Sequence, residues 1–151
     1  LTGKTALAVG VVLAGLGGSL ALAATVDEAI QGRQACMKDH GKAMGVMFKM
    51  MKGESPYDNA AVQDALKMMN ANCGGWDSWW GPETMKGDKV ETYAKPEVWS
   101  DNAGFQAAGK AFYDKYLALQ ATTDEASFKA ALPALGEACK GCHEKFRRPK
   151  E

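Results

Sequence analysis

The sequence predicts an all-α protein, built as an antiparallel up-down four-helix bundle. Apolar residues recur at a spacing of three and four positions in four segments, which is the period of an amphipathic helix. No segment shows the strict alternation of a half-buried strand. Short links join the first segment to the second and the third to the fourth, so consecutive helices are expected to be antiparallel neighbours in a bundle.

The first two helices are expected at about 26–52 and 58–72. The apolar seam of the first helix has two polar interruptions, Arg33 and His40. Gly, Ser and Pro at residues 53–56 break the helical pattern and predict the turn into the second helix.

The last two helices are expected at about 95–120 and from residue 122 onward. Residues 81–95 contain Gly-Pro and Lys-Gly-Asp and predict a long connection. Thr122 and Glu125 have the spacing of a capping box, which predicts the start of the fourth helix. Pro133 lies inside that helix and predicts a kink.

The N-terminal residues 1–24 have the pattern of a cleaved signal peptide. Lys4 precedes an apolar run at 6–22, and small residues at 21–23 suit a cleavage site. A retained membrane anchor is the alternative, because the run is nearly long enough to span a bilayer. The sequence therefore predicts export to the periplasm and one mature domain at 25–151.

The chain as a whole has no net formal charge, because it contains 18 basic and 18 acidic residues. Loss of the predicted signal peptide removes only Lys4 and leaves a net charge of −1. Such a balance offers no basic stripe for nucleic acid. No acid, base or nucleophile marks an obvious substrate pocket, so we expect a protein that is not an enzyme and that has no membrane contact after cleavage.

The most specific motif is C-x-x-C-H at Cys139, Cys142 and His143, the attachment sequence of a c-type haem. Two thiols three residues apart lie on one side of a helix, where they can add to the two vinyl groups of one porphyrin. The imidazole that follows is then placed to ligate the iron. The alternatives are dithiol redox chemistry or a zinc site completed by Cys36 and Cys73.

Cys36 and Cys73 are the remaining cysteines, and their positions predict a disulfide. Each lies 18 residues from the expected turn at residues 54–55. In an antiparallel hairpin both positions are then about 27 Å from the turn, at about 1.5 Å per residue. The alternative is a pair of unpaired buried thiols.

Three stretches of the sequence resemble the cytochrome c′ family, the class II cytochromes c. They are residues 33–38, residues 95–99 and the C-x-x-C-H-x-x-F-R run that ends at Arg147. Cytochrome c′ is itself a standard example of a four-helix bundle. Residues 37–41 and 52–58 look closer to the low-spin branch, whose iron has His and Met ligands.

The resemblance implies a role for each matched residue around one covalently bound haem c. His143 corresponds to the proximal ligand, and Met37 to the residue that faces the other side of the iron. Arg33 corresponds to an arginine near a haem propionate, although a solvated charge is the alternative. Arg147 corresponds to a basic residue beside the proximal face, and Trp99 is expected to lie nearest the porphyrin.

Two functions are possible, and they differ in whether a protein ligand binds the distal side of the iron. With Met37 as second ligand the iron is closed, and the protein carries single electrons between redox partner proteins. If Met37 only covers the iron, as one more core methionine, the protein is a five-coordinate cytochrome c′ that binds small gases such as nitric oxide or carbon monoxide. His40 is a rival distal ligand on the same seam, and an imidazole at the bundle surface is its alternative.

Two surfaces are candidates for protein contacts. Basic residues around the haem motif, Lys140, Lys145, Arg147, Arg148 and Lys150, form either a solvated helix end or a docking patch for an acidic redox partner. Members of the family are often dimers, so the resemblance also implies a homodimer through the first two helices.

Overall fold

The computed structural model describes residues 24–149. Four long helices dominate it: α1 (Val26–Met51), α2 (Asn59–Met69), α4 (Asn102–Gln120) and α5 (Glu125–Phe146). Three short helical turns lie between α2 and α4, namely η1 (Trp76–Ser78), η2 (Pro82–Met85) and α3 (Glu97–Ser100).

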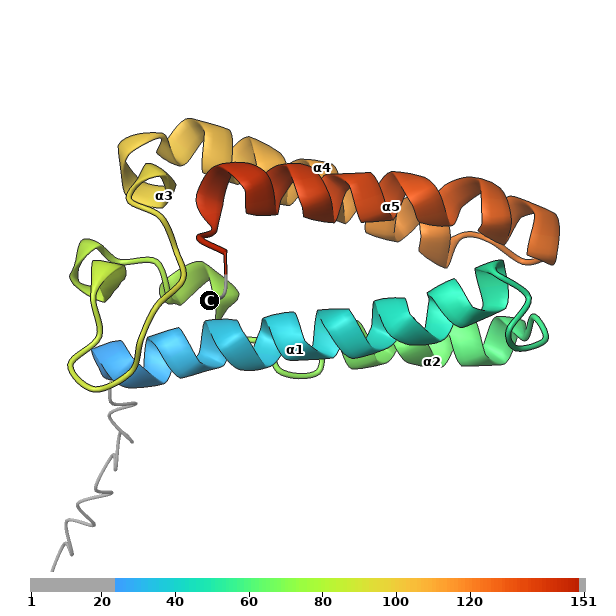
Figure 1. Cartoon of the computed structure of the whole chain (residues 1–151), viewed down its shortest axis with the longest axis horizontal. Coiled ribbons are helices and arrows are strands. Elements are labelled where there is room, and N and C mark those ends of the chain that lie inside the picture. Colours follow the sequence, from blue (N-terminus) through green and yellow to red (C-terminus); the bar gives the residue numbers. More distant parts are fainter. Residues whose placement is uncertain (1–23, 150–151) are drawn as a thin grey trace, which may run out of the picture.

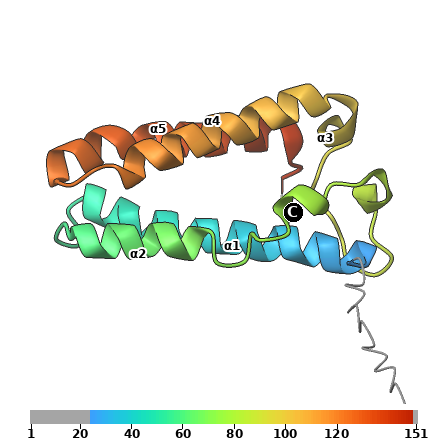
Figure 2. The same cartoon turned by 180° about the vertical axis from the view of Figure 1, so that it is seen from behind.

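The four long helices form two antiparallel hairpins that pack against each other. Figure 1 shows α1 and α2 in one layer and α4 and α5 in the other, and α5 runs opposite to α1. The view from behind shows the same arrangement, with the short turns gathered at the end where α1 begins and α5 ends (Figure 2). The predicted up-down four-helix bundle is confirmed by this arrangement of the four long helices (Figure 1, Figure 2).

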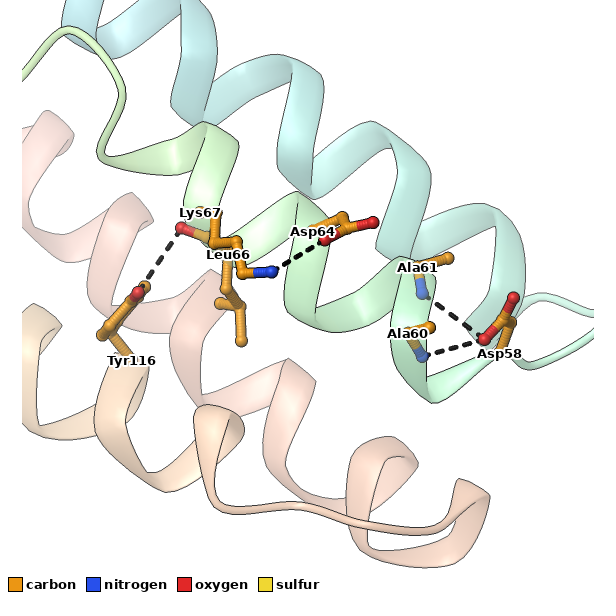
Figure 3. A network of polar contacts seen from close by, with 7 residues as sticks. All are labelled: Asp58, Ala60, Ala61, Asp64, Leu66, Lys67 and Tyr116. Atoms are coloured by element: carbon orange, nitrogen blue, oxygen red, sulfur yellow. Dashed lines mark hydrogen bonds and ion pairs between the residues drawn. The ribbon is translucent and has the colours of Figure 1, made fainter.

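Side-chain caps fix where α1 and α2 begin. Thr25 and Glu28 form a capping box at the start of α1. The Asp58 carboxylate accepts hydrogen bonds from the backbone N–H groups of Ala60 and Ala61, which are otherwise without partners at a helix start (Figure 3). The α1–α2 hairpin therefore begins and turns close to where the sequence predicts.

The predicted third helix is wrong in one respect, because it breaks at Asp101. The backbone there has φ −122° and ψ 58°, outside the helical region, so that α3 ends and α4 begins. The Asp101 carboxylate accepts the Gly104 N–H and pairs with Lys145 of α5, which offsets the lost helical hydrogen bonds. The break lets the chain turn over the end of the bundle.

The predicted start of the fourth helix is also wrong. The capping box that forms is Asp124 with Ser127, two residues later than the predicted pair. Thr122 is buried, and its hydroxyl donates to the Leu119 carbonyl at the end of α4. The helix α5 then runs through Pro133 without a break.

The apolar core has two parts, one at each end of the bundle. The larger lies toward the two hairpin turns and includes the fully buried Met47, Leu66 and Phe128. It is closed by the Tyr116 hydroxyl, which donates to the Leu66 carbonyl at 3.4 Å and ties α4 to α2 (Figure 3). The smaller is built on Val98, Phe105 and Phe146, with Trp76, Trp80, Ala94, Trp99, Ala108 and Cys142 packed against it.

Within residues 24–149, no helix combines the length and the apolar character needed to cross a bilayer. The predicted signal peptide at 1–24 lies almost entirely outside the described residues.

Candidate haem site

The helix α5 presents Cys139, Cys142 and His143 next to the smaller core. Both thiols are free and half-buried, and burial raises the pKa of each. They are therefore neutral thiols in apolar surroundings, able to add to the vinyl groups of a porphyrin that lies against α5. Cys142 packs on the tryptophan-rich core, so a haem attached here would meet aromatic side chains on that side.

His143 is half-buried and held in its neutral form. Burial, followed by the positive charge of Arg147, lowers the pKa of His143. The neutral imidazole is the form that ligates a metal. The helix end that carries it is fixed, since the Lys95 N–H donates to the Phe146 carbonyl and the Arg148 N–H donates to the Tyr93 carbonyl.

The register of α1 and α5 indicates that Met37 and His143 lie at similar heights on facing helices. A Cβ at Gly136 of α5 would lie 3.4 Å from the Phe48 ring and 4.0 Å from the Met44 methyl group of α1, which sets the register of these antiparallel helices. Seven residues back from Met44 is Met37, and seven residues forward from Gly136 is His143. Seven residues are nearly two full turns, so both steps cover about 10.5 Å and return to the same face.

A cavity of about 420 Å³ opens between these two helices beside the motif. Its lining is mostly apolar and consists of Met44, Phe48, Met51, Pro133, Gly136, Glu137 and Cys139. Because Cys139 lies on its wall, the space adjoins the predicted point of attachment.

Arg33 is a buried cation without an acidic partner. Its side chain is 4% exposed, and burial lowers its pKa to about 10, so that it is still charged at neutral pH. Its guanidinium donates to the Thr84 hydroxyl and to the Thr84 carbonyl, at 3.4 and 3.0 Å. Among residues 24–149 no carboxylate pairs with it, although a buried charge is costly without a counter-charge. The predicted alternative of a solvated charge is therefore wrong.

Next to Arg33 lies a second group that lacks a partner. The Trp80 ring centroid is 4.4 Å from the guanidinium carbon, and the Trp80 indole N–H is buried with no acceptor among the described residues. The Trp99 indole differs, because it donates to the carbonyls of Trp80 and Gly81. An unpaired cation and an unpaired donor together suit an anionic group such as a haem propionate. The residues present thus fit the cofactor that the motif implies.

His40 is turned toward other partners than the α1–α5 space. Its ring stacks on Phe112 of α4, with centroids 5.0 Å apart, and its Nε2 lies 3.7 Å from both Cys36 Sγ and Cys73 Sγ. Burial lowers the pKa of His40 to about 4. The ring is thus held by an aromatic face and two sulfur atoms, and it is not an imidazole at the bundle surface.

The two cysteines of the predicted disulfide lie in contact. The sulfur atoms of Cys36 on α1 and Cys73 in the turn after α2 are 2.01 Å apart. This arrangement separates them from Cys139 and Cys142, and the metal-ligand cluster found within residues 24–149 holds Cys36, His40 and Cys73 alone. The four cysteines therefore do not share one zinc site.

The predicted basic patch is largely neutralised. Lys140 lies 3.9 Å from Glu144, Lys145 pairs with Asp101, and Arg148 lies 3.1 Å from Glu91. Exposed pairs of this kind contribute little stability, but they cancel the charge that would steer an acidic partner. Lys150 lies outside the described residues.

Sequence comparison places the chain in a family. Residues 28–147 match the family described as Cytochrome C′. The chain belongs to the cytochrome c′ family. Proteins of this family carry one covalently bound haem c with its iron, and they are not enzymes in the usual sense.

Individual cytochromes c′ agree with the family assignment. Cytochrome c′ of Rubrivivax gelatinosus is 37% identical over 123 residues, which are 80% of this chain and 94% of the relative. Its crystal structure has a TM-score of 0.74 and covers 82% of this chain and 97% of its own. A nitric oxide complex of a leucine variant of cytochrome c′ from Alcaligenes xylosoxidans is 31% identical, with a TM-score of 0.73 over 84% and 98% of the two chains.

These relatives bear on the two predicted branches. They are cytochromes c′, and one of them is solved with nitric oxide bound, which does not support the predicted low-spin branch with His and Met ligands. The family and its covalently bound haem c are thus established.

Proposed function

We propose that this protein is an exported, periplasmic cytochrome c′ whose haem iron, ligated by His143, binds a small gas such as nitric oxide or carbon monoxide on its distal side. The observation that carries the proposal is the set of similar cytochromes c′ solved as nitric oxide and carbon monoxide complexes. The haem supplies reversible one-electron chemistry and an iron that accepts a diatomic ligand.

Each of five residues would have its own role in holding the haem. Cys139 and Cys142 would anchor the porphyrin to α5, and His143 would ligate the iron in its neutral form. Arg33 and the Trp80 indole N–H would hold a propionate, because among residues 24–149 the buried Arg33 has no acidic partner and the buried Trp80 N–H has no acceptor. Their charges and hydrogen bonds fix the haem against the smaller core.

Met37 would cover the distal face without bonding the iron. Its half-buried thioether is level with His143 and belongs to the α1 face that lines the apolar cavity. An apolar covering favours a neutral diatomic molecule over water or anions, since these lose hydrogen bonds on entry.

A second candidate is an electron carrier in which Met37 is the sixth ligand and His143 the fifth. The level placement of the two residues favours it as well, because a thioether that faces the iron can bind it. This protein would exchange electrons with redox partner proteins and would not respond to gases.

An optical spectrum of the reduced holoprotein, with and without carbon monoxide, tests the proposal. A high-spin spectrum that changes with carbon monoxide is expected. Met37→Leu serves as the matched variant, because it keeps an apolar side chain of similar size and removes the sulfur. If Met37 only covers the iron, the variant remains high-spin; a wild type that is low-spin and becomes high-spin in the variant would establish the electron carrier instead.

We further propose a homodimer through α1 and α2. Val46 on α1 and Met68 on α2 are each 38% exposed, so both apolar side chains are available to a partner helix. One of the similar cytochromes c′, with a TM-score of 0.75, is described by a ligand-controlled dimer dissociation. Sedimentation of Val46→Glu against wild type tests the assignment, and an unchanged mass would contradict it.

A further inference from the structure

Away from the haem motif, three side chains that can ligate a metal lie close together. Cys36 and His40 belong to α1, and Cys73 belongs to the turn after α2. The Nε2 atom of His40 and the sulfur atoms of Cys36 and Cys73 all lie within 4.8 Å of one another. Cys36 is fully buried, while His40 and Cys73 are half-buried, so the cluster lies just beneath the surface. None of the roles assigned to the haem uses these three groups.

We propose that reduction of the Cys36–Cys73 pair converts this cluster into a binding site for one zinc ion, with two thiolates and the His40 imidazole as ligands. An external dithiol supplies two electrons and two protons and becomes a disulfide, while the Cys36–Cys73 S–S bond breaks and two thiols form. With a phosphine, the electrons come from phosphorus, which becomes the phosphine oxide, and water supplies the oxygen and the two protons. Zinc then displaces one proton from each thiol, so that two thiolates and a neutral imidazole surround the dication. While the S–S bond is intact, the site is closed to metal.

The positions of the ligand atoms suit a tetrahedral ion. With Zn–S bonds of about 2.3 Å and Zn–N bonds of about 2.0 Å, a sulfur and a nitrogen on the same zinc lie roughly 3.5 Å apart. The Nε2 atom of His40 is 3.7 Å from each of the two sulfur atoms. Only the sulfurs must separate, and breaking their bond allows this.

The surroundings hold His40 ready as a ligand. Its ring is stacked on Phe112 at an interplanar angle of 17°, which fixes the ring plane while Nε2 points at the sulfurs. His40 is neutral at neutral pH, and the neutral imidazole is the ligating form. Two cysteines and one histidine are a known zinc ligand set that leaves the fourth position to water.

Zinc is favoured over harder cations by the donor set. Thiolate and imidazole are soft to borderline donors, whereas calcium and magnesium require oxygen ligands. The nearest carboxylate on α1, Asp39, is already engaged by Asn72 and Lys42. The cluster therefore offers sulfur and nitrogen and little oxygen.

The holoprotein permits a clean test, because in it Cys139 and Cys142 are consumed as thioethers and only two thiols can form. The protein is reduced with a phosphine under anaerobic conditions, given one equivalent of zinc(II), desalted and analysed by elemental analysis and native mass spectrometry. We expect one zinc, in place of two protons, per reduced molecule. The oxidised protein should bind none.

Two variants separate the site from adventitious binding. Cys36→Ser/Cys73→Ser removes both thiols and should retain no zinc under reducing conditions. His40→Gln keeps a polar side chain of similar length and should weaken zinc binding by roughly 100-fold, since even outer partners of a zinc ligand contribute about 10- to 100-fold. Circular dichroism of each reduced protein reports whether the helices persist.

Three results would overturn the proposal. The first is an equal zinc content in the reduced wild type and the double-serine variant. The second is unchanged affinity in His40→Gln. The third is a loss of helix on reduction that zinc does not reverse, because the site needs α1 and the end of the α2 segment to stay together.

Discussion

The guanidinium carbon of Arg33 lies 4.4 Å from the centroid of the Trp80 ring, and the indole N–H of Trp80 is buried without an acceptor among residues 24–149. The pair is thus a cation and a hydrogen-bond donor, stacked in a site that excludes water. A cation over an indole face gains stability, but an aromatic ring does not replace a counter-charge. The arrangement is complete only when an anion lies beside it.

Replacing Arg33 by Met is expected to lower the reduction potential of the haem. The substitution keeps the apolar stem and removes a buried positive charge. A positive charge near the iron favours the reduced haem over the oxidised haem, so its loss lowers the reduction potential. A charge in a partly screened interior shifts a potential by on the order of tens of millivolts. Spectroelectrochemical titration measures the shift.

Arg148→Met is the matched control for the potential. This arginine is about half exposed and pairs with Glu91, so solvent screens its charge. The haem reduction potential of the Arg148→Met variant should stay close to that of the wild type. Identical potentials for Arg33→Met and the wild type would show that Arg33 does not face the haem.

Removal of the Cys36–Cys73 pair is expected to destabilise the protein. The two residues are 37 apart in sequence, and closing a loop of that length lowers the entropy of the unfolded chain by an amount equivalent to about 4 kcal/mol. Urea unfolding of Cys36→Ser/Cys73→Ser should show this loss. The wild type unfolded with a reductant should reach the same midpoint, and alkylation of two thiols in the untreated holoprotein would refute the bond itself.

The position of a helix can be predicted from the sequence when the residues that determine it lie close together in the chain. The start of α1 is predicted at the residue observed, because the apolar seam and the cap lie within the segment. The break at Asp101 is not predictable in this way. It depends on Lys145, which is 44 residues away and meets Asp101 only after α4 and α5 have packed.

The residues of the candidate site also differ in whether the sequence alone predicts them. Cys139, Cys142 and His143 are a contiguous motif, and Arg33 is visible as a charge in an apolar seam. The buried N–H of Trp80, which has no acceptor among the described residues, is not visible in the sequence. Its environment combines the 3₁₀ turns at 76–78 and 82–85, which the sequence does not indicate, with Arg33 of α1 and Phe105 of α4. Likewise, nothing in α1 shows that Phe112 stacks on His40, since Phe112 belongs to α4.

Without zinc and with the Cys36–Cys73 bond intact, the stability of the protein is expected to depend on pH through His40. Burial lowers the pKa of His40 from 6.5 to about 4. Between these two values the unfolded chain binds a proton that the folded chain excludes, so stability rises with pH across this interval. The contribution is complete above pH 6.5 and is lost as the pH falls toward 4. Its size is on the order of 3 kcal/mol, at about 1.4 kcal/mol per pKa unit.

His40→Gln isolates this contribution, because glutamine does not titrate and fits a space of similar length. Urea unfolding of the wild type and the variant is compared at intervals from pH 4 to pH 7. The difference in unfolding free energy between the two should grow in favour of the wild type as the pH rises to 6.5 and then stay constant. Other acidic and basic groups titrate equally in both proteins, so a difference that does not vary with pH would mean that the His40 ring is solvated in the folded state.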